Sequence, residues 1–432
     1  MGYRLGSTTA KVNTSFGRSW NTNINKLGLY PTTTTKFVAT CDVICQYQNM
    51  SFGVTSGTLH VSTDSSVTFP TTVSFTDANL VRAGHIFANG NIMFTTRDNK
   101  IYLTNTDLDT PVEKTIYEAD GVTPYVIHTP SNATYPGWYF EILTYQERNV
   151  NENLHVFGNY CNAYDNGAAP VNIYYSNDNG ETYKIAYEFG QNLNYRDNGT
   201  ATGSDTTGTL LGDSGNANVS RHMHSIGYDT VNDKWYAVVG DHNEPDTKSQ
   251  VADEIGWYEG AYTVETDIWV WTRIDFGFSI ETTNHLKAIQ PIFHDGYVYW
   301  GSDVQTVTDS TQNGLWRSPI ATITDVATHR QIFAIEELYA SSIVDFRIDR
   351  DSGVVIGSIN DPWSPAVKRR RLFTISNYGL GKLSLYTDAS GDFMRISDKN
   401  SDGYYMFDYE GRDTLQTKTF FIRIGSDFLD NL

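Results

Sequence analysis

The stretch SRHMHSIGYDTVNDKWYAVVGDH, residues 220–242, decides how the rest of the chain is interpreted. Two runs rich in β-branched and aromatic residues flank residues 229–233, a loop of turn formers, and this pattern predicts a β-hairpin. Because an antiparallel hairpin brings the start of its first strand beside the end of its second, one end should gather several polar side chains. These are Arg221, His222, His224, Asp241 and His242. The alternative is a surface hairpin with an Arg–Asp cross-strand pair, worth about 0.2–1 kcal/mol.

Strands like the second strand of this hairpin recur along the chain. They are Ile92–Asp98, Lys234–Asp241, Tyr297–Asp303 and Val354–Asp361, and the runs 138–145 and 154–159 supply a further unit in the longest gap. The turns Asn89-Gly90 and Asp295-Gly296 are typical of hairpins, because a type I′ turn needs positive φ at its central positions. A repeated four-strand unit predicts a propeller, whose blades bury their faces against one another.

The predicted fold is therefore all-β: a β-propeller of six blades, with seven as the alternative. Blades should start near residues 37, 80, 138, 221, 286 and 343, and a closing hairpin near 404–424 completes the ring or adds a seventh blade. Residues 1–36 are expected to be a polar N-terminal arm, and 37–432 a single domain. The composition, with Tyr 28, Phe 21, Trp 9 and Gly 35, agrees with many strands joined by tight turns.

Charge and hydropathy exclude some classes of function. The net charge of −19 argues against nucleic acid as the main ligand, and the basic run 368–371 is interpreted as a charged edge or loop. No apolar stretch is long enough for a transmembrane helix, and the N-terminus lacks a secretory signal. Cys41, Cys45 and Cys161 have no zinc-site spacing, and Cys41 and Cys45 are expected to be small core residues.

One motif resembles a known repeat. Ile173–Tyr183 contains Ser176, Asp178, Gly180, Thr182 and Tyr183. This is similar to the Asp-box of the BNR-repeat, sialidase-like propellers, whose pattern is Ser-x-Asp-x-Gly-x-Thr-Trp. A weaker copy at residues 62–69 has Ser66 in place of the glycine. The resemblance implies a six-bladed propeller, or a seven-bladed one like related glycosidases and polysaccharide lyases, with the motif as a structural turn rather than a catalytic site.

In a propeller, the starts of the first strands and the ends of the second strands meet on one face around the axis. We therefore expect a funnel formed by the hairpin residues above together with other polar groups and aromatic stacking platforms. The polar groups are Arg82, His85, His285, Lys287, Asp98, Asp303 and Asp361, and the aromatic residues are Tyr299, Trp300 and Trp363. Such a funnel is suited to binding an anionic or hydroxyl-rich glycan.

Three kinds of chemistry are open for this funnel. The first is binding alone, with His and Arg donating hydrogen bonds to sugar carboxylates or hydroxyls. The second is catalysis by a polysaccharide lyase or glycoside hydrolase, with His222 or His224 as base, Arg221 neutralising a uronate, and Asp241 as a candidate carboxylate. The third is a divalent metal held by His222 and His224 with His242 or His285. A sialidase is not expected, because no Phe-Arg-Ile-Pro-like motif is present.

The sequence thus predicts a propeller that recognises a glycan or polysaccharide, with no resident cofactor unless a divalent metal binds. A fold that faces glycans without a secretion signal suggests a virion protein, such as part of a phage tail, that contacts other virion proteins or forms a homo-oligomer. The alternative from a different class is a structural propeller that acts as a ring or adaptor in a larger assembly.

Overall fold

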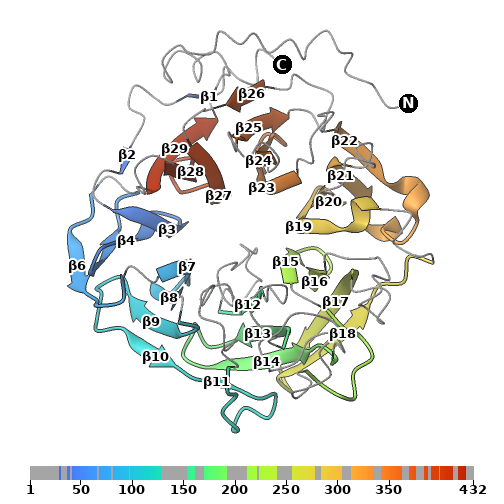
Figure 1. The fold of residues 1–432 in the computed structure, drawn as a ribbon, viewed down its shortest axis with the longest axis horizontal. Coiled ribbons are helices and arrows are strands. Elements are labelled where there is room, and N and C mark those ends of the chain that lie inside the picture. Colours follow the sequence, from blue (N-terminus) through green and yellow to red (C-terminus); the bar gives the residue numbers. More distant parts are fainter. Residues whose placement is uncertain are drawn as a thin grey trace, which may run out of the picture.

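The strands surround a central axis as separate sheets (Figure 1). The computed structural model describes residues 29–30, 37–38, 41–65, 68–78, 81–96, 98–127, 153–160, 170–191, 212–220, 223–240, 255–277, 284–303, 313–334, 342–361, 369–375, 384–387, 391–397, 399–411 and 417–424. Within these residues there are seven sheets, and each forms one blade. The predicted all-β propeller is confirmed.

Blades 1 to 3 use the first half of the chain. Blade 1 contains β3 (Asp42–Tyr47), β4 (Met50–Thr55), β5 (Thr58–Ser62) and β6 (Thr71–Ser74). Blade 2 contains β7 (Val81–Ile86), β8 (Asn91–Thr96), β9 (Ile101–Asn105) and β10 (Val112–Lys114). Blade 3 contains β12 (His155–Gly158), β13 (Asn172–Ser176) and β14 (Tyr183–Glu188), with β11 (Ile116–Tyr117) parallel to β14 at its outer edge. The strand predicted at 138–145 lies outside the described residues.

Blades 4 to 6 repeat the four-strand order. Blade 4 contains β15 (Met223–Asp229), β16 (Lys234–Val239), β17 (Gly256–Thr263) and β18 (Ile268–Arg273). Blade 5 contains β19 (Ala288–His294), β20 (Tyr297–Ser302), β21 (Gly314–Pro319) and β22 (Arg330–Ala334), with the short 3-10 helices η3 (Asn284–Leu286), η5 (Ile320–Thr322) and η6 (Val326–Thr328). Blade 6 contains β23 (Ser342–Ile348), β24 (Val355–Asp361), β25 (Arg369–Ile375) and β26 (Ser384–Thr387).

Blade 7 joins the two ends of the chain. Its strands β27 (Gly391–Ile396), β28 (Tyr404–Gly411) and β29 (Thr417–Ile424) come from the C-terminal side, while β1 (Leu29–Tyr30) and β2 (Phe37–Val38) pair with β29 from the N-terminal side. The first expectation of six blades is wrong by one. The predicted closing hairpin at 404–424 is a part of a full blade, because β27 and the N-terminal strands complete it.

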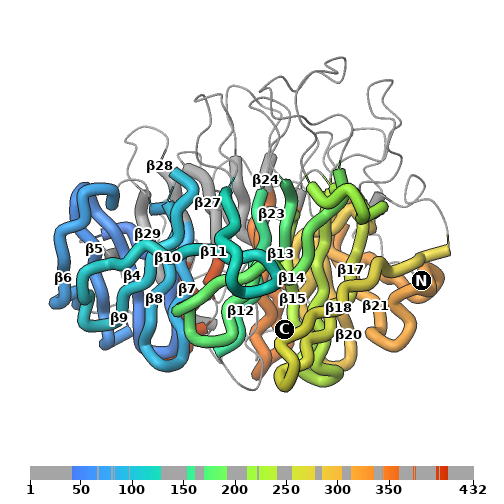
Figure 2. Tube along the Cα trace, turned by 90° about the horizontal axis from the view of Figure 1, so that it is seen from below, coloured from blue at the N-terminus to red at the C-terminus, as the bar shows by residue number. Residues whose placement is uncertain are grey.

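The strands run between two faces of the ring (Figure 2). We call the face where the first strands begin and the second strands end the loop face, and the opposite one the turn face. On the turn face, first and second strands are joined by tight turns with residues at positive φ. Asp295 and Gly296 have φ of 50° and 76°, as the type I′ prediction requires. At Asn89-Gly90 only the glycine has positive φ, so the type I′ expectation is wrong for that turn.

The hydrophobic core lies mainly between neighbouring blades. Phe52 of blade 1 stacks on Phe94 of blade 2, with ring centroids 5.4 Å apart, and Tyr299 of blade 5 packs in one cluster with Ile343 of blade 6. The first strands of blades 4 and 5 approach so closely that a Cβ on Gly227 would lie 2.0 Å from the carbonyl oxygen of Pro291. No helix among the described residues is long and apolar enough to span a membrane.

Candidate functional site

Three of the predicted polar residues meet on the loop face where blades 4 and 5 adjoin. His224 is near the start of β15, Lys287 directly precedes β19, and Asp303 directly follows β20. Asp303 Oδ2 lies 3.9 Å from His224 Nε2 and 3.7 Å from Lys287 Nζ. The three side chains are between 5 and 15% exposed, so their charges lie in a mostly enclosed environment. We call this group the His224–Lys287–Asp303 cluster.

Backbone contacts fix the geometry of the cluster. His224 Nδ1 lies 2.8 Å from the carbonyl oxygen of Ala288, and the amide of Asp303 donates to the carbonyl of Lys287 at 2.8 Å. Because a carbonyl only accepts, Nδ1 carries the proton and Nε2 of a neutral His224 is an acceptor. The separations of 3.7 and 3.9 Å exceed a direct hydrogen bond, so these contacts of Asp303 with Lys287 and His224 are electrostatic.

A recurring β-bulge explains why His224 points toward blade 5. In six first strands of the described chain, the register with the second strand shifts by one residue at matching positions. The residues at the shift are Ile44, Arg82, His224, Gln290 with Pro291, Val344 and Met394. Bulges re-aim side chains and often lie beside functional sites.

Two of the bulged side chains, those of Gln290 and His224, also bind the neighbouring blade. Gln290 Oε1 accepts from the amide of Phe346 in blade 6 at 3.2 Å, just as His224 binds the backbone of blade 5. His224 therefore combines a structural contact through Nδ1 with a polar edge, Nε2, that faces Asp303. Arg82 occupies the same position in β7, where only its backbone is described.

The other predicted hairpin residues cannot be placed in this cluster. Arg221, His222, Asp241 and His242 lie outside the described residues, so their catalytic and metal-binding roles stay predictions. Within the described ranges, no group of three or more His, Cys, Asp or Glu side chains is arranged to hold a metal ion.

Three other predicted funnel residues are elsewhere. His85 is near the end of β7 toward the turn face, and its ring stacks on His155 of blade 3 with centroids 4.0 Å apart. His285 is buried in η3 and contacts His329. Trp300 is 0% exposed and donates from Nε1 to the carbonyl of His285 at 2.7 Å. The expectation that Trp300 stacks on a sugar is wrong, because both faces of β20 are covered by neighbouring blades.

Asp42 is a candidate that the sequence reasoning missed. It begins β3 on the loop face and is half-buried, and burial raises the pKa of its carboxyl to about 6. No hydrogen bond or ion pair joins its side chain to another described residue. Asp42 comes two residues before the bulge in β3, and in the sequence His222 comes two residues before the bulge in β15. This shared position is the signal that could have revealed Asp42 as a candidate.

The turn at residues 176–183, between β13 and β14, is held together by its own side chains. Asp178 accepts from Ser176 Oγ at 2.9 Å and from the amide and hydroxyl of Thr182 at 2.9 and 2.7 Å, while the amide of Gly180 donates to Ser176 Oγ at 2.8 Å. Gly180 has a φ of +85°, and Tyr183 is buried. The side chains thus hold a tight turn on the turn face, away from the cluster.

The weaker copy forms the same kind of turn between β5 and β6. Asp64 accepts from Ser62 Oγ at 2.7 Å and from the amide and hydroxyl of Thr68 at 2.9 and 2.7 Å. In blade 2 the corresponding turn uses Asn105, which accepts from the amides of Asp107 and Asp109 at 3.1 and 3.2 Å.

Asp178→Ala should lower the free energy of unfolding by about 1–3 kcal/mol, because it removes three hydrogen bonds in a partly buried turn. Asp64→Ala should cost less, since the contacts of Asp64 with Thr68 are exposed. Urea unfolding of both variants measures the difference. Asp107→Ala is the control and should change stability by less than about 0.5 kcal/mol. Equal stability of Asp178→Ala and the parent chain would contradict the structural role of the motif.

Sheets in a ring around an axis place this chain in the β-propeller class. Among solved structures, the chain is similar to YCF48 bound to D1 peptide, with a TM-score of 0.45 and 11% identity over 92% of this chain and 94% of that chain. It is also similar to the β-propeller domain of Cps50 (Swd1) from Myceliophteria thermophila, with a TM-score of 0.45 and 10% identity over 89% of this chain and 98% of that chain. No protein-family model and no curated protein matches the sequence.

Proposed function

We propose that this propeller binds a carbohydrate on its loop face, where blades 4 and 5 adjoin. The observation that carries the proposal is the His224–Lys287–Asp303 cluster, in which the imidazole of His224 and the ammonium group of Lys287 each lie within 4 Å of the carboxylate of Asp303. A carboxylate and an imidazole can bind neighbouring sugar hydroxyls, and an ammonium group can neutralise an acidic sugar. Charge-assisted hydrogen bonds in an enclosed site are stronger than exposed ones.

The spacing of the strands along the chain supports this location. Residues 189–222 join β14 to β15, 240–255 join β16 to β17, and 303–313 join β20 to β21, all in blades 3 to 5. The corresponding second-to-third connections of blades 1 and 2 are only residues 56–57 and 97–100. Binding residues are frequently found on the longer connections of a rigid scaffold, so the side of the ring with the cluster is the better candidate.

We further propose that the chain is a sialidase-like, Asp-box propeller. Two turns with matching hydrogen bonds, at Asp178 and Asp64, support this type. In the lyase or hydrolase alternative, Arg221, His222 and Asp241 act together with the cluster. The placement in a virion, and the partners that this implies, stay predictions.

A glycan array followed by product analysis on each hit tests the proposal. Asp303→Asn and Lys287→Ala should each weaken binding by about 10–100-fold, which is the effect of losing a charge-assisted hydrogen bond. Unsaturated products would identify a lyase, new reducing ends a hydrolase, and binding without turnover a lectin-like receptor.

The matched control is Lys100→Ala. Lys100 pairs with Asp98 at 3.5 Å after the second strand of blade 2, as Lys287 pairs with Asp303 in blade 5. This variant should bind like the parent chain. A ligand whose affinity is unchanged by Asp303→Asn would show that the cluster is not the site.

One observation favours the structural alternative. On β18, the outermost strand of blade 4, Ile268 and Val270 are 54% and 60% exposed and form an apolar outer edge. Such edges are typical of contact surfaces in assemblies. No hit on the array, together with stable assembly into a larger particle, would favour a propeller that serves as an adaptor.

A further inference from the structure

A buried pair of histidines lies behind the candidate site in blade 5. His285 Nε2 of η3 is 2.9 Å from His329 Nδ1, and His329 Nε2 is 2.7 Å from the carbonyl oxygen of Ile323. Both side chains are almost completely buried. The ring of His285 also stacks on Trp316, with centroids 4.2 Å apart, and Trp300 contacts His329 edge-on.

The contacts define where the protons are. Because the carbonyl of Ile323 only accepts, His329 carries its proton on Nε2. Nδ1 of a neutral His329 must then accept from Nε2–H of His285. A proton added to His329 Nδ1 would place two N–H groups opposite each other, unless His285 moved its own proton to Nδ1. Protonation of both rings would bury two positive charges within hydrogen-bonding distance, so the pair would have to separate.

The surroundings favour the neutral pair. Burial lowers the pKa of His329, and the positive charge of Arg330 lowers it further. The hydrogen bond to Ile323 and the negative charge of Asp325 raise this pKa, but they do not outweigh burial. Among the described residues, the aromatic rings of Trp300, Trp316 and Phe276 also contact this pair. A lowered pKa in the folded state means that the stabilisation is complete above about pH 6.5, the ordinary imidazole value, and is lost as the pH falls through the folded pKa.

The helix η3 connects this pair to the cluster. Its carbonyls accept from two buried indoles: Trp300 Nε1 donates to His285 at 2.7 Å, and Trp257 Nε1 donates to Leu286 at 3.0 Å. The next two residues are Lys287, which pairs with Asp303, and Ala288, whose carbonyl binds His224. A displacement of His285 is therefore transmitted within three residues to every member of the cluster.

We propose that the His285–His329 pair is a pH-responsive latch, which holds η3 and the cluster in place near neutral pH and releases them in acid. The effect on a ligand rests on the proposed carbohydrate site, whereas the proton-linked change in η3 does not.

Histidine-selective NMR and near-ultraviolet circular dichroism of the full chain between pH 8 and 5 test the latch. We expect His329 to titrate below about pH 6.5, with a tryptophan dichroism change at the same midpoint. His329→Gln, which keeps one donor and one acceptor, should abolish both signals. His294→Gln, at the other end of β19, should leave them unchanged. Titration of His329 at the ordinary value in the parent chain, with constant dichroism, would overturn the latch even if His329→Gln does not fold.

Binding of trigalacturonate, an acidic sugar, gives the second readout. Between pH 7.5 and 5.0, affinity should fall about tenfold in the parent chain and much less in His329→Gln. An equal fall in both proteins would overturn the latch. An absence of binding at either pH would count against the acidic-sugar proposal, while the NMR and dichroism still decide on the histidine pair.

Discussion

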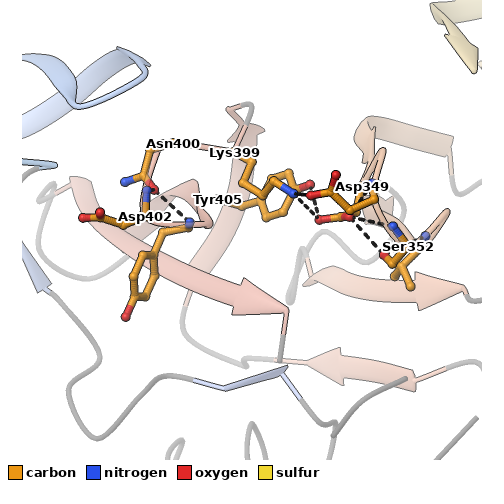
Figure 3. A network of polar contacts seen from close by, with 9 residues as sticks. Asp349, Ser352, Lys399, Asn400, Asp402 and Tyr405 are labelled. Carbon is orange, nitrogen blue, oxygen red and sulfur yellow. Dashed lines mark hydrogen bonds and ion pairs between the residues drawn. The ribbon is translucent and has the colours of Figure 1, made fainter. Parts of the chain in front are cut away.

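Asp349→Ala should lower the free energy of unfolding by about 3–5 kcal/mol, because it leaves a buried polar network without its central acceptor. Asp349 is at the end of the first strand of blade 6, and its side chain is 6% exposed. It accepts from Lys399 Nζ at 3.2 Å and Tyr405 Oη at 2.9 Å, both from blade 7, and from the amide and hydroxyl of Ser352 at 3.0 Å (Figure 3). One carboxylate thus links two blades, and urea unfolding measures its contribution.

Asp351→Ala is the matched control, since Asp351 also pairs with Lys399 but is 83% exposed. It should cost less than about 1 kcal/mol. Equal effects of the two substitutions would show that the network adds nothing beyond surface charge.

The network also predicts a pH dependence. Burial would raise the pKa of Asp349, but the hydrogen bond from Tyr405, the charge of Lys399 and the amide of Ser352 outweigh it and hold the pKa below its ordinary value. A carboxyl with a lowered folded pKa stabilises fully above about pH 4, and this contribution disappears as the pH falls through the folded pKa. The stability difference between the parent chain and Asp349→Asn should therefore shrink between pH 5 and 3.

Gly227→Ala should be nearly as damaging, at about 3 kcal/mol or more. The added Cβ would lie 2.0 Å from the carbonyl oxygen of Pro291, a backbone atom that cannot rotate away, so the first strands of blades 4 and 5 would have to separate. Thermal unfolding followed by circular dichroism should show a lower midpoint. His224 binds the same strand of blade 5, so ligand binding should weaken as well.

Gly215→Ala provides the comparison. A Cβ there would meet only the side chain of Asp213, at 3.3 Å, and the change in stability should be below about 1 kcal/mol. If Gly227→Ala is as stable as the parent chain, the close approach of blades 4 and 5 is not present in solution.

The repeated second strands were sufficient to predict the fold, because runs such as Lys234–Val239 are buried on both sides and bounded by turn residues. The number of blades could not be predicted in the same way, because β1 and β2 have only two residues each and pair with a strand almost four hundred positions away. Pairing at that separation leaves no local pattern.

The candidate site was predictable only in part. His224, Lys287 and Asp303 meet because they flank the ends of strands whose order the hairpins fix. His85 was misplaced although a strand start near residue 80 was predicted, because it lies four residues beyond Val81, near the other end of β7. Trp300 was assigned to the rim because strands buried on both faces have no alternation that separates inner from outer side chains. The bulge that orients His224 has no residue signature of its own.

The pairing of β1 and β2 with β29 has a consequence for synthesis on the ribosome. The strands β1 and β2 have their partner in Thr417–Ile424, which is made after the six blades that lie between them in the sequence. The nascent chain must therefore exist for most of its synthesis as an open arc whose terminal blades expose unpaired strand edges, a form prone to aggregation. Chaperone demand should accordingly be highest just before β29 emerges.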